Sequence, residues 1–184
     1  MQIKSAIAGR RTTSPRRQRG MSMIEMGLVL VIITIAIVGV VNAFASNSAS
    51  TQANQLSNDL SLVIGKVKSA YSGQYANVSN TKLSSGGFFS NLTSLTNTSG
   101  TVTTGLGGGT LTVSPGTVTA ANDSVKYVIT QVPDSACLPL VTALSKTSTT
   151  LTVGSNSVKA AGGVPDPSKI TCAADNTTIT IQVQ

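Results

Sequence analysis

The chain has 184 residues, enough for one modest domain and an additional segment. Only 10% of the residues are charged and 3% are aromatic, and histidine and tryptophan are absent. The lack of histidine excludes histidine-based catalytic triads and HExxH zinc sites. With six acidic residues and two cysteines, the sequence offers no recognisable catalytic group. We therefore expect a protein that is not an enzyme and has no catalytic residues, no metal and no cofactor.

The net charge of +7 lies almost entirely in the first twenty residues. The rest of the chain holds seven basic and six acidic residues, a net charge of +1. A basic leader before a nearly neutral body differs from the basic face of a nucleic-acid-binding domain, so we expect no direct nucleic-acid site. The leader contains no acid, and its basic residues are Lys4, Arg10, Arg11, Arg16, Arg17 and Arg19.

Residues 26–45 read MGLVLVIITIAIVGVVNAFA and contain no charged residue. Twenty helical residues span about 30 Å, the thickness of a bilayer core. A lone strand cannot satisfy its backbone hydrogen bonds in lipid, so this segment is expected to be a helix despite its many β-branched residues. Basic residues before the segment, with none for twenty residues after it, predict a single pass with a cytoplasmic N-terminus.

Apolar residues continue beyond this segment at spacings of three and four. That spacing predicts a helix with one apolar face. The first break signal is Ser72-Gly73, so residues 22–71 are predicted to form one continuous helix, apolar all round in its first half and amphipathic in its second. The apolar face comprises Ala49, Ala53, Leu56, Leu60, Val63, Val67 and Ala70.

Serine, threonine, asparagine and glycine dominate from about Gly73 onward. A helix is predicted from Asp134 or Ser135, either of which can cap it, with Leu138, Val141, Ala143 and Leu144 as its apolar side. Residues 92–109 hold few large side chains and are expected to form a surface loop. The predicted fold is α+β, with the long helix packed against an antiparallel β-sheet. Alternating runs predict strands at residues 109–113, 117–121, 124–132, 149–153 and 177–183.

Glu25 is the only charged residue between Arg19 and Asp59, and it opens the apolar run. A carboxylate at a helix N-terminus complements the helix dipole, so Glu25 alone is equally consistent with an ordinary helix start. The residues around Glu25 favour a more specific role for it than an ordinary helix start. Residues 19–28 read RGMSMIEMGL and follow directly on the basic leader.

This string resembles the N-terminal signature of the type IV prepilins. That signature is a basic leader ending in glycine, an apolar first mature residue, glutamate four positions later, and about twenty apolar residues. A twenty-residue leader followed by methionine resembles the type IVb subclass. The resemblance implies that prepilin peptidase cleaves between Gly20 and Met21, that Met21 is N-methylated, and that Glu25 is the assembly charge.

The resemblance also implies a disulfide between Cys137 and Cys172, which closes a C-terminal loop. Such a loop is expected to stabilise the fold by about 4 kcal/mol on the chain-entropy model. The domain boundaries combine the changes in composition and the helix break at Ser72-Gly73 with the cleavage that the resemblance implies. They are a cleaved leader at residues 1–20, a transmembrane or filament-core helix half at 21–45, an amphipathic helix half at 46–72, and a globular β-rich head at 73–184.

By this resemblance the chain is the major structural subunit of a type IVb pilus, a fibre used in adhesion, aggregation, DNA transfer (conjugation) or motility. It is expected to lie in the inner membrane before assembly and in an extracellular filament afterwards. Expected partners are copies of itself, prepilin peptidase, the assembly platform, its ATPase and the secretin.

Two alternatives remain open. One is a secreted or periplasmic soluble module, because Ala43-Phe44-Ala45 fits a signal-peptide cleavage site after Ala45. The apolar run is longer than a typical signal-peptide core, and that interpretation leaves Glu25 unexplained. The other is a monomeric membrane-anchored protein or a pseudopilin.

Overall fold

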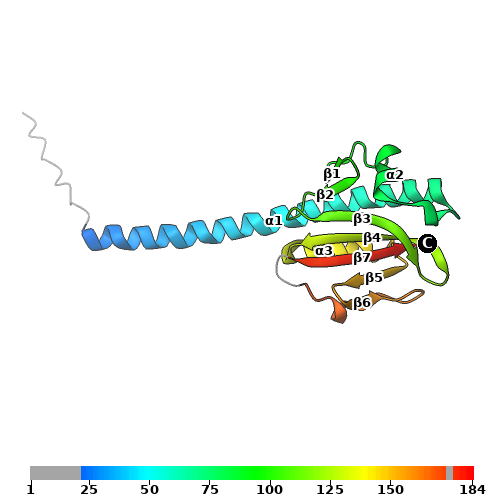
Figure 1. Cartoon of the computed structure of the whole chain (residues 1–184). Coiled ribbons are helices and arrows are strands. Elements are labelled where there is room, and N and C mark those ends of the chain that lie inside the picture. The colour runs from blue at the N-terminus through cyan, green and yellow to red at the C-terminus, as the bar shows by residue number, and fades with distance from the viewer. Residues whose placement is uncertain (1–21, 173–175) are drawn as a thin grey trace, which may run out of the picture. The chain divides into compact units, whose positions relative to one another are not determined.

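The computed structural model describes residues 22–172 and 176–184. The chain forms two units, one ending at Val40 and the other beginning at Val41. Helix α1 (Met23–Tyr71) contributes to both units (Figure 1). This confirms the helix predicted over residues 22–71. The predicted cleavage residues Gly20 and Met21 lie outside the described residues.

The strands of the described chain form one seven-stranded sheet in the order β1-β2-β3-β4-β7-β5-β6 (Figure 1). Every neighbouring pair is antiparallel. The last strand of the chain, β7, therefore lies inside the sheet, between β4 and β5. The strands are β1 (Leu95–Thr98), β2 (Thr101–Thr104), β3 (Thr110–Thr117), β4 (Ala121–Val132), β5 (Thr150–Val153), β6 (Asn156–Lys159) and β7 (Thr177–Val183).

The helical elements after α1 are η1 (Tyr75–Asn77), α2 (Asn80–Ser85), α3 (Asp134–Leu144) and η2 (Pro167–Lys169). Helix α2 is tied to the sheet by its first residue. The Asn80 side chain donates to the Leu111 carbonyl at 2.8 Å and accepts from the Val113 N–H at 2.7 Å. It thereby satisfies two backbone groups of β3.

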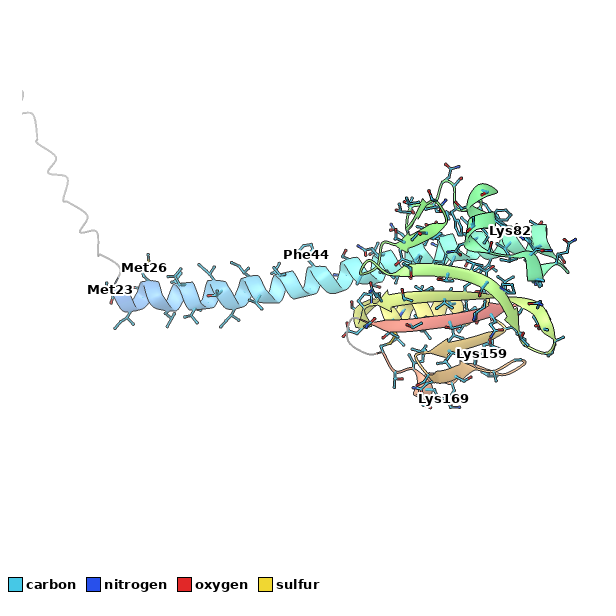
Figure 2. The ribbon with its side chains drawn as sticks, viewed as in Figure 1. Met23, Met26, Phe44, Lys82, Lys159 and Lys169 are labelled. Carbon is cyan, nitrogen blue, oxygen red and sulfur yellow. A yellow bond between two sulfur atoms is a disulfide. The ribbon has the colours of Figure 1, made fainter. Side chains whose placement is uncertain are left out.

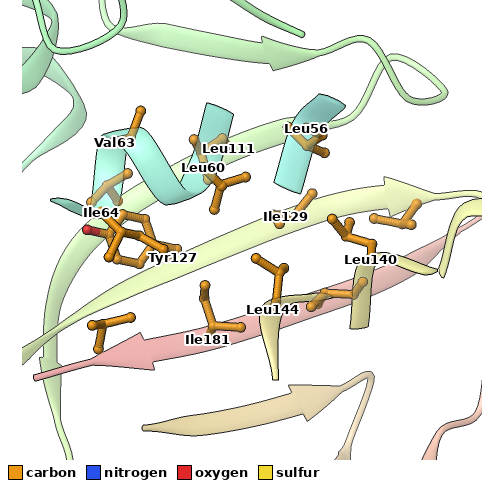
Figure 3. Close-up of a cluster of buried hydrophobic side chains, with 14 of the residues drawn as sticks. Leu56, Leu60, Val63, Ile64, Leu111, Tyr127, Ile129, Leu140, Leu144 and Ile181 are labelled. Atoms are coloured by element: carbon orange, nitrogen blue, oxygen red, sulfur yellow. The ribbon is translucent and has the colours of Figure 1, made fainter. Parts of the chain in front are cut away.

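The core lies between the sheet and the apolar faces of α1 and α3 (Figure 3). Leu56, Leu60 and Val63 of α1 are fully buried, as are Ile129 and Ile181 of the sheet. Burial of each such side chain is worth about 2 kcal/mol, so packing, more than helix propensity, holds the second half of α1 in place. This confirms the predicted amphipathic half, except that Ala70, expected on the apolar face, is exposed.

Two of the predictions for the sheet are wrong. Residues 117–121 are not a separate strand: Thr117 ends β3, Ala121 starts β4, and a turn joins them. Asp123 holds this turn, because its carboxylate accepts the N–H groups of residues 118, 119 and 120, each at 2.8 Å. Residues 92–109 are not a loop, because they contain the β1–β2 hairpin. Strand β6 and helix α2 were not predicted.

Helix α3 occupies the predicted range, but two details differ. Its N-cap is Pro133, and among the described residues no side chain caps it, so neither Asp134 nor Ser135 has the predicted capping role. Leu138, expected on the apolar side, is 56% exposed, whereas Leu140 is fully buried. The buried face of α3 is rotated from the predicted one and consists of Ala136, Cys137, Leu140, Val141 and Leu144.

Candidate functional site

The first half of α1 presents an apolar surface on every side. Residues Met23–Val41 form a helix that is long and apolar enough to cross a membrane. None of this segment is buried within the described chain, and the side chains of Met23 and Met26 stand away from the helix in Figure 2. Exposed apolar surface of this extent marks a contact with lipid or with other protein chains.

Glu25 lies in the first turn of α1 and is exposed. Its N–H donates to the Ser22 carbonyl at 2.9 Å. Within the described residues its carboxylate has no hydrogen-bond or ion-pair partner, and it is the only charged group in the Met23–Val41 segment. The carboxylate complements the positive end of the helix dipole and remains available to a cation outside the described residues.

Polar and small residues of this segment suit close packing between helices. The Thr34 hydroxyl donates to the Leu30 carbonyl of its own helix, so it is satisfied without water. A Cβ built on Gly27 or Gly39 would meet nothing within 4 Å in the described chain. Small residues of this kind let apolar helices approach each other closely.

The disulfide predicted from the family resemblance is confirmed. Cys137 in α3 is bonded to Cys172 with a Cα–Cα distance of 6.0 Å, 35 residues apart in the chain, a separation that suits an S–S bond. Cys137 is fully buried and Cys172 half-buried. The bond attaches the segment before β7 to a helix of the core.

Asp59 is a buried acid whose role was not predicted. It lies on the amphipathic half of α1 and is 8% exposed. Its Oδ2 atom accepts from the backbone N–H groups of Thr93 (3.0 Å) and Ser94 (2.8 Å) and from their hydroxyls, at 3.4 and 2.6 Å. Asp59 therefore attaches the segment that leads into β1 to the long helix.

Asp59 is expected to contribute to acid stability. Burial raises the pKa of Asp59, but the hydrogen bonds from Ser94 and Thr93 together lower it by more, so its pKa lies below the ordinary value. A lowered pKa gives stability that is fully present above about pH 4 and is lost as the pH falls through the folded-state pKa. Asp59→Asn should lower the free energy of unfolding at pH 7 by about 2 kcal/mol and flatten the acid limb of the stability curve.

Thermal unfolding of the full chain in detergent micelles between pH 2 and 7 measures both effects. Asp134→Asn is the matched control, because Asp134 is exposed and its carboxylate makes no hydrogen bond or ion pair with the described residues. An acid limb equally steep in Asp59→Asn and in the native chain would contradict the assignment.

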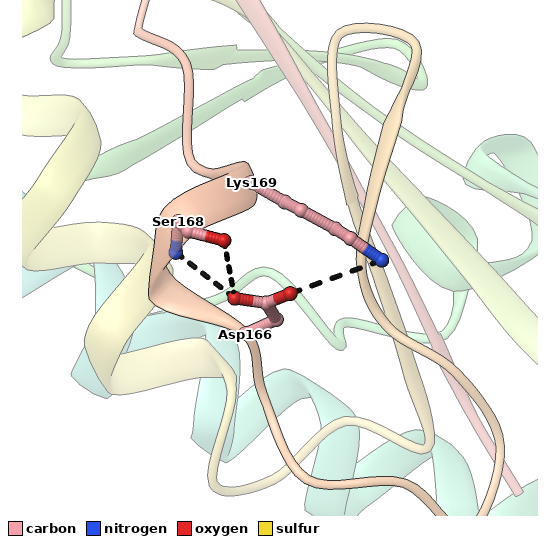
Figure 4. A network of polar contacts seen from close by, with 3 residues as sticks. All are labelled: Asp166, Ser168 and Lys169. Atoms are coloured by element: carbon pink, nitrogen blue, oxygen red, sulfur yellow. Dashed lines mark hydrogen bonds and ion pairs between the residues drawn. The ribbon is translucent and has the colours of Figure 1, made fainter.

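Two other carboxylates also serve local turns. Asp166 accepts from the Ser168 N–H at 3.1 Å and hydroxyl at 2.7 Å, and pairs with Lys169 at 3.8 Å (Figure 4). Hydrogen bonds, first of all from the Thr119 hydroxyl, lower the pKa of Asp123. Among the described residues no group of three histidine, cysteine, aspartate or glutamate side chains is placed to hold a metal ion.

Comparisons with known proteins agree with this architecture. No curated protein matches the chain. Among solved structures, the crystal structure of the type IVb pilin from Salmonella typhi matches with a TM-score of 0.50 and 22% identity, covering 73% of this chain and 98% of that one. This likeness shows the type IVb pilin fold and agrees with the resemblance seen in the leader. The family model described as PilS N terminal matches residues 50–184, so the chain belongs to the PilS N-terminal family and has the fold of a type IVb pilin.

Proposed function

We propose that this chain is the major structural subunit of a type IVb pilus, held in the inner membrane before assembly and polymerising through its N-terminal helix. The observation that carries the proposal is the exposed apolar helix Met23–Val41 with its single carboxylate, Glu25. A soluble domain would bury such a surface. A subunit that moves from lipid into a bundle of its own helices needs the surface in both settings.

Glu25 gives this bundle a fixed register in the proposal. Cleavage after Gly20 leaves a positive amine on Met21. In a filament core a lone buried carboxylate is costly, whereas pairing with the Met21 amine of a neighbouring copy neutralises both charges. Buried charge pairs are best attested as devices that select one register, which suits a subunit that must dock at one axial offset.

The other parts of the chain follow from the same proposal. Residues 1–20 are the cleaved leader, 21–45 the membrane and filament-core half of the helix, 46–72 the half that packs in the head, and 73–184 the head. The proposed partners are copies of the chain, prepilin peptidase, the assembly platform, its ATPase and the secretin. The filament is extracellular.

The first residue of the mature chain tests this proposal against the secreted-module alternative. We expect N-methylated Met21, detected by mass spectrometry of the purified protein, and filaments in electron micrographs only of cells that express the chain. Ser46 as the first residue would support the secreted module and overturn the proposal.

Gly20→Val should block maturation. A branched side chain at the residue before the cut is expected to obstruct the narrow peptidase site, so the precursor keeps its six basic leader residues and stays in the membrane. Immunoblots of membrane fractions should show the slower-migrating precursor as the main form, and Gly9→Val, within the leader but away from the cut, should mature normally. Normal maturation of Gly20→Val would count against the cleavage site.

A further inference from the structure

A shallow groove of about 610 Å³ lies between the end of α1 and the loop after α2. Lys66 and Ser69 line it from α1, and Gly86, Gly87 and Phe88 line it from the loop. Lys66 is exposed, and within the described chain no hydrogen bond or ion pair engages its ammonium group. The groove therefore combines a cation that has no described partner with an aromatic ring and two glycines.

Gly65 also lines this groove from α1, and no packing contact within the described chain requires a glycine there. A Cβ built on it would meet nothing within 4 Å, and its φ is not in the left-handed region. Glycine is the poorest helix former after proline. Without a side chain, Gly65 leaves this side of the helix open to close approach by another chain.

The side chains next to Gly65 form an exposed pair on α1. Leu62 is 57% exposed and lies four residues before Lys66, so the two side chains occupy the same face, one turn apart. Exposed leucine is otherwise scarce in the unit that begins at Val41. The α1 face thus carries an apolar contact followed, in chain direction, by a positive charge.

Helix α3 carries the complementary pair in the opposite order. Asp134 is exposed at its first turn, and Leu138, 56% exposed, follows four residues later on the same face. Asp59, Asp123 and Asp166 are hydrogen-bonded within their own chain. Asp134 is thus the one carboxylate of the described part from Val41 onward with no hydrogen-bond or ion-pair partner there.

We propose that the α1 groove of one subunit receives the exposed face of α3 from a second copy of this chain. With the two helices antiparallel, Leu138 of one copy meets Leu62 of the other while Asp134 meets Lys66. The α1 pair and the α3 pair match in spacing as well as in charge, because the two residues of each pair lie four positions apart, about 6 Å along the helix axis. Gly65 lets the partner helix approach between them.

This contact rests on the proposed polymerisation and specifies where the heads meet. The groove and the exposed face of α3 are different surfaces of one chain, so the contact between two copies is heterologous. Repetition of a heterologous contact extends an open array of subunits. A single contact of this size is weak. Repetition along a filament already joined through the N-terminal helices makes it effective.

Zero-length carbodiimide crosslinking of native filaments tests the placement directly. Mass spectrometry should find an amide bond between Lys66 and Asp134 in filaments and not in the same chain dispersed as monomer in detergent. Filaments that form but yield crosslinks elsewhere, with Lys66–Asp134 absent, would overturn the proposal while leaving the pilus function intact. A chain that forms no filaments would instead overturn the proposed function.

Charge reversal gives the energetic test. Lys66→Glu should reduce filament number on the order of tenfold, as expected for a like-charge contact at an interface. Adding Asp134→Lys to that variant should restore filaments, although Asp134→Lys alone reduces them. Lys146→Glu is the control, because Lys146 is an exposed lysine near the end of α3 and outside the proposed contact. Failure of the double variant to recover, with monomers that melt like the native chain, would contradict the contact.

Gly65→Ala distinguishes an effect on the stability of the subunit from an effect on filament assembly. Alanine favours the helix and meets no described neighbour, so the melting temperature of the monomer should rise. The added methyl group enters the proposed contact, so filaments should be fewer. Unchanged filament number together with the higher melting temperature would show that nothing approaches Gly65.

Discussion

Glu25→Val is expected to leave cells without filaments while the subunit accumulates, correctly processed, in the inner membrane. The substitution removes the only charge from the Met23–Val41 segment. Insertion into lipid should become slightly easier, because a carboxylate in a membrane helix costs about 3 kcal/mol at mid-depth and less near the interface. The loss should therefore appear only at assembly, where the amine of Met21 no longer finds its partner.

Two measurements on the same cells isolate this step. Mass spectrometry should show methylated Met21 in Glu25→Val, and electron microscopy should show filaments reduced at least a hundredfold, since an unpaired buried charge costs about 3 kcal/mol or more. Glu25→Asp keeps the charge and should assemble in part, whereas Met26→Val changes an apolar neighbour and should assemble normally. Filaments in native number from Glu25→Val would reduce Glu25 to a helix-start residue that complements the dipole.

The long helix was predictable because two independent signals agree over its length. Residues 26–45 carry no charge, and the apolar spacing continues to Val67 without proline or a glycine pair. The structure places Met23–Tyr71 in one helix. The apolar face differed only at its end, where Ala70 is exposed. The disulfide was predicted too, although from the family resemblance and not from spacing.

The sheet was only partly predictable, because its outer strands are short and rich in threonine. In the segment 92–109, Leu95, Val102 and Leu106 are the buried apolar residues, too few to give an alternating pattern. The turn between β1 and β2 uses Ser99 and Gly100, both with positive φ. That conformation is uncommon for serine, and the Ser99-Gly100 pair marks a turn without showing that strands flank it.

Asp59 shows why tertiary roles of single polar residues were missed. On a helical wheel it lies at the edge of the apolar face, between Gln55 and Val63, and resembles a solvated side chain. Its partners Thr93 and Ser94 are 34 and 35 residues away, and only the folded chain brings their N–H groups to the carboxylate. The strand predicted at residues 117–121 was wrong for a related reason. The alternating pattern there is typical of a strand, but hydrogen bonds from the N–H groups of residues 118–120 to the Asp123 carboxylate hold these residues in a turn.

Removing the disulfide should loosen one part of the head first. Cys137 lies in α3, whose Leu140, Val141 and Leu144 remain buried without the bond. The segment on the other side is held less firmly: between β6 and Cys172, residues 160–169 are mostly exposed or half-buried, and only Ile170 packs against the core. Loss of the crosslink should therefore release this segment while the sheet and α3 persist.

Cys137→Ala combined with Cys172→Ala should lower the free energy of unfolding by about 4 kcal/mol, the chain-entropy value for a loop of this length, and the melting temperature by on the order of 10 °C. Hydrogen exchange should rise first in residues 160–172 and leave α1 near its native rate. Each cysteine substitution removes only one sulfur atom, so the control must be a truncation of similar size. Ala136→Gly serves this purpose, because Ala136 is a fully buried neighbour in α3 and its truncation leaves the disulfide bond intact. Equal melting of the double variant and the native chain, or faster exchange spread evenly over the sheet, would show that the bond does not hold this segment to the core.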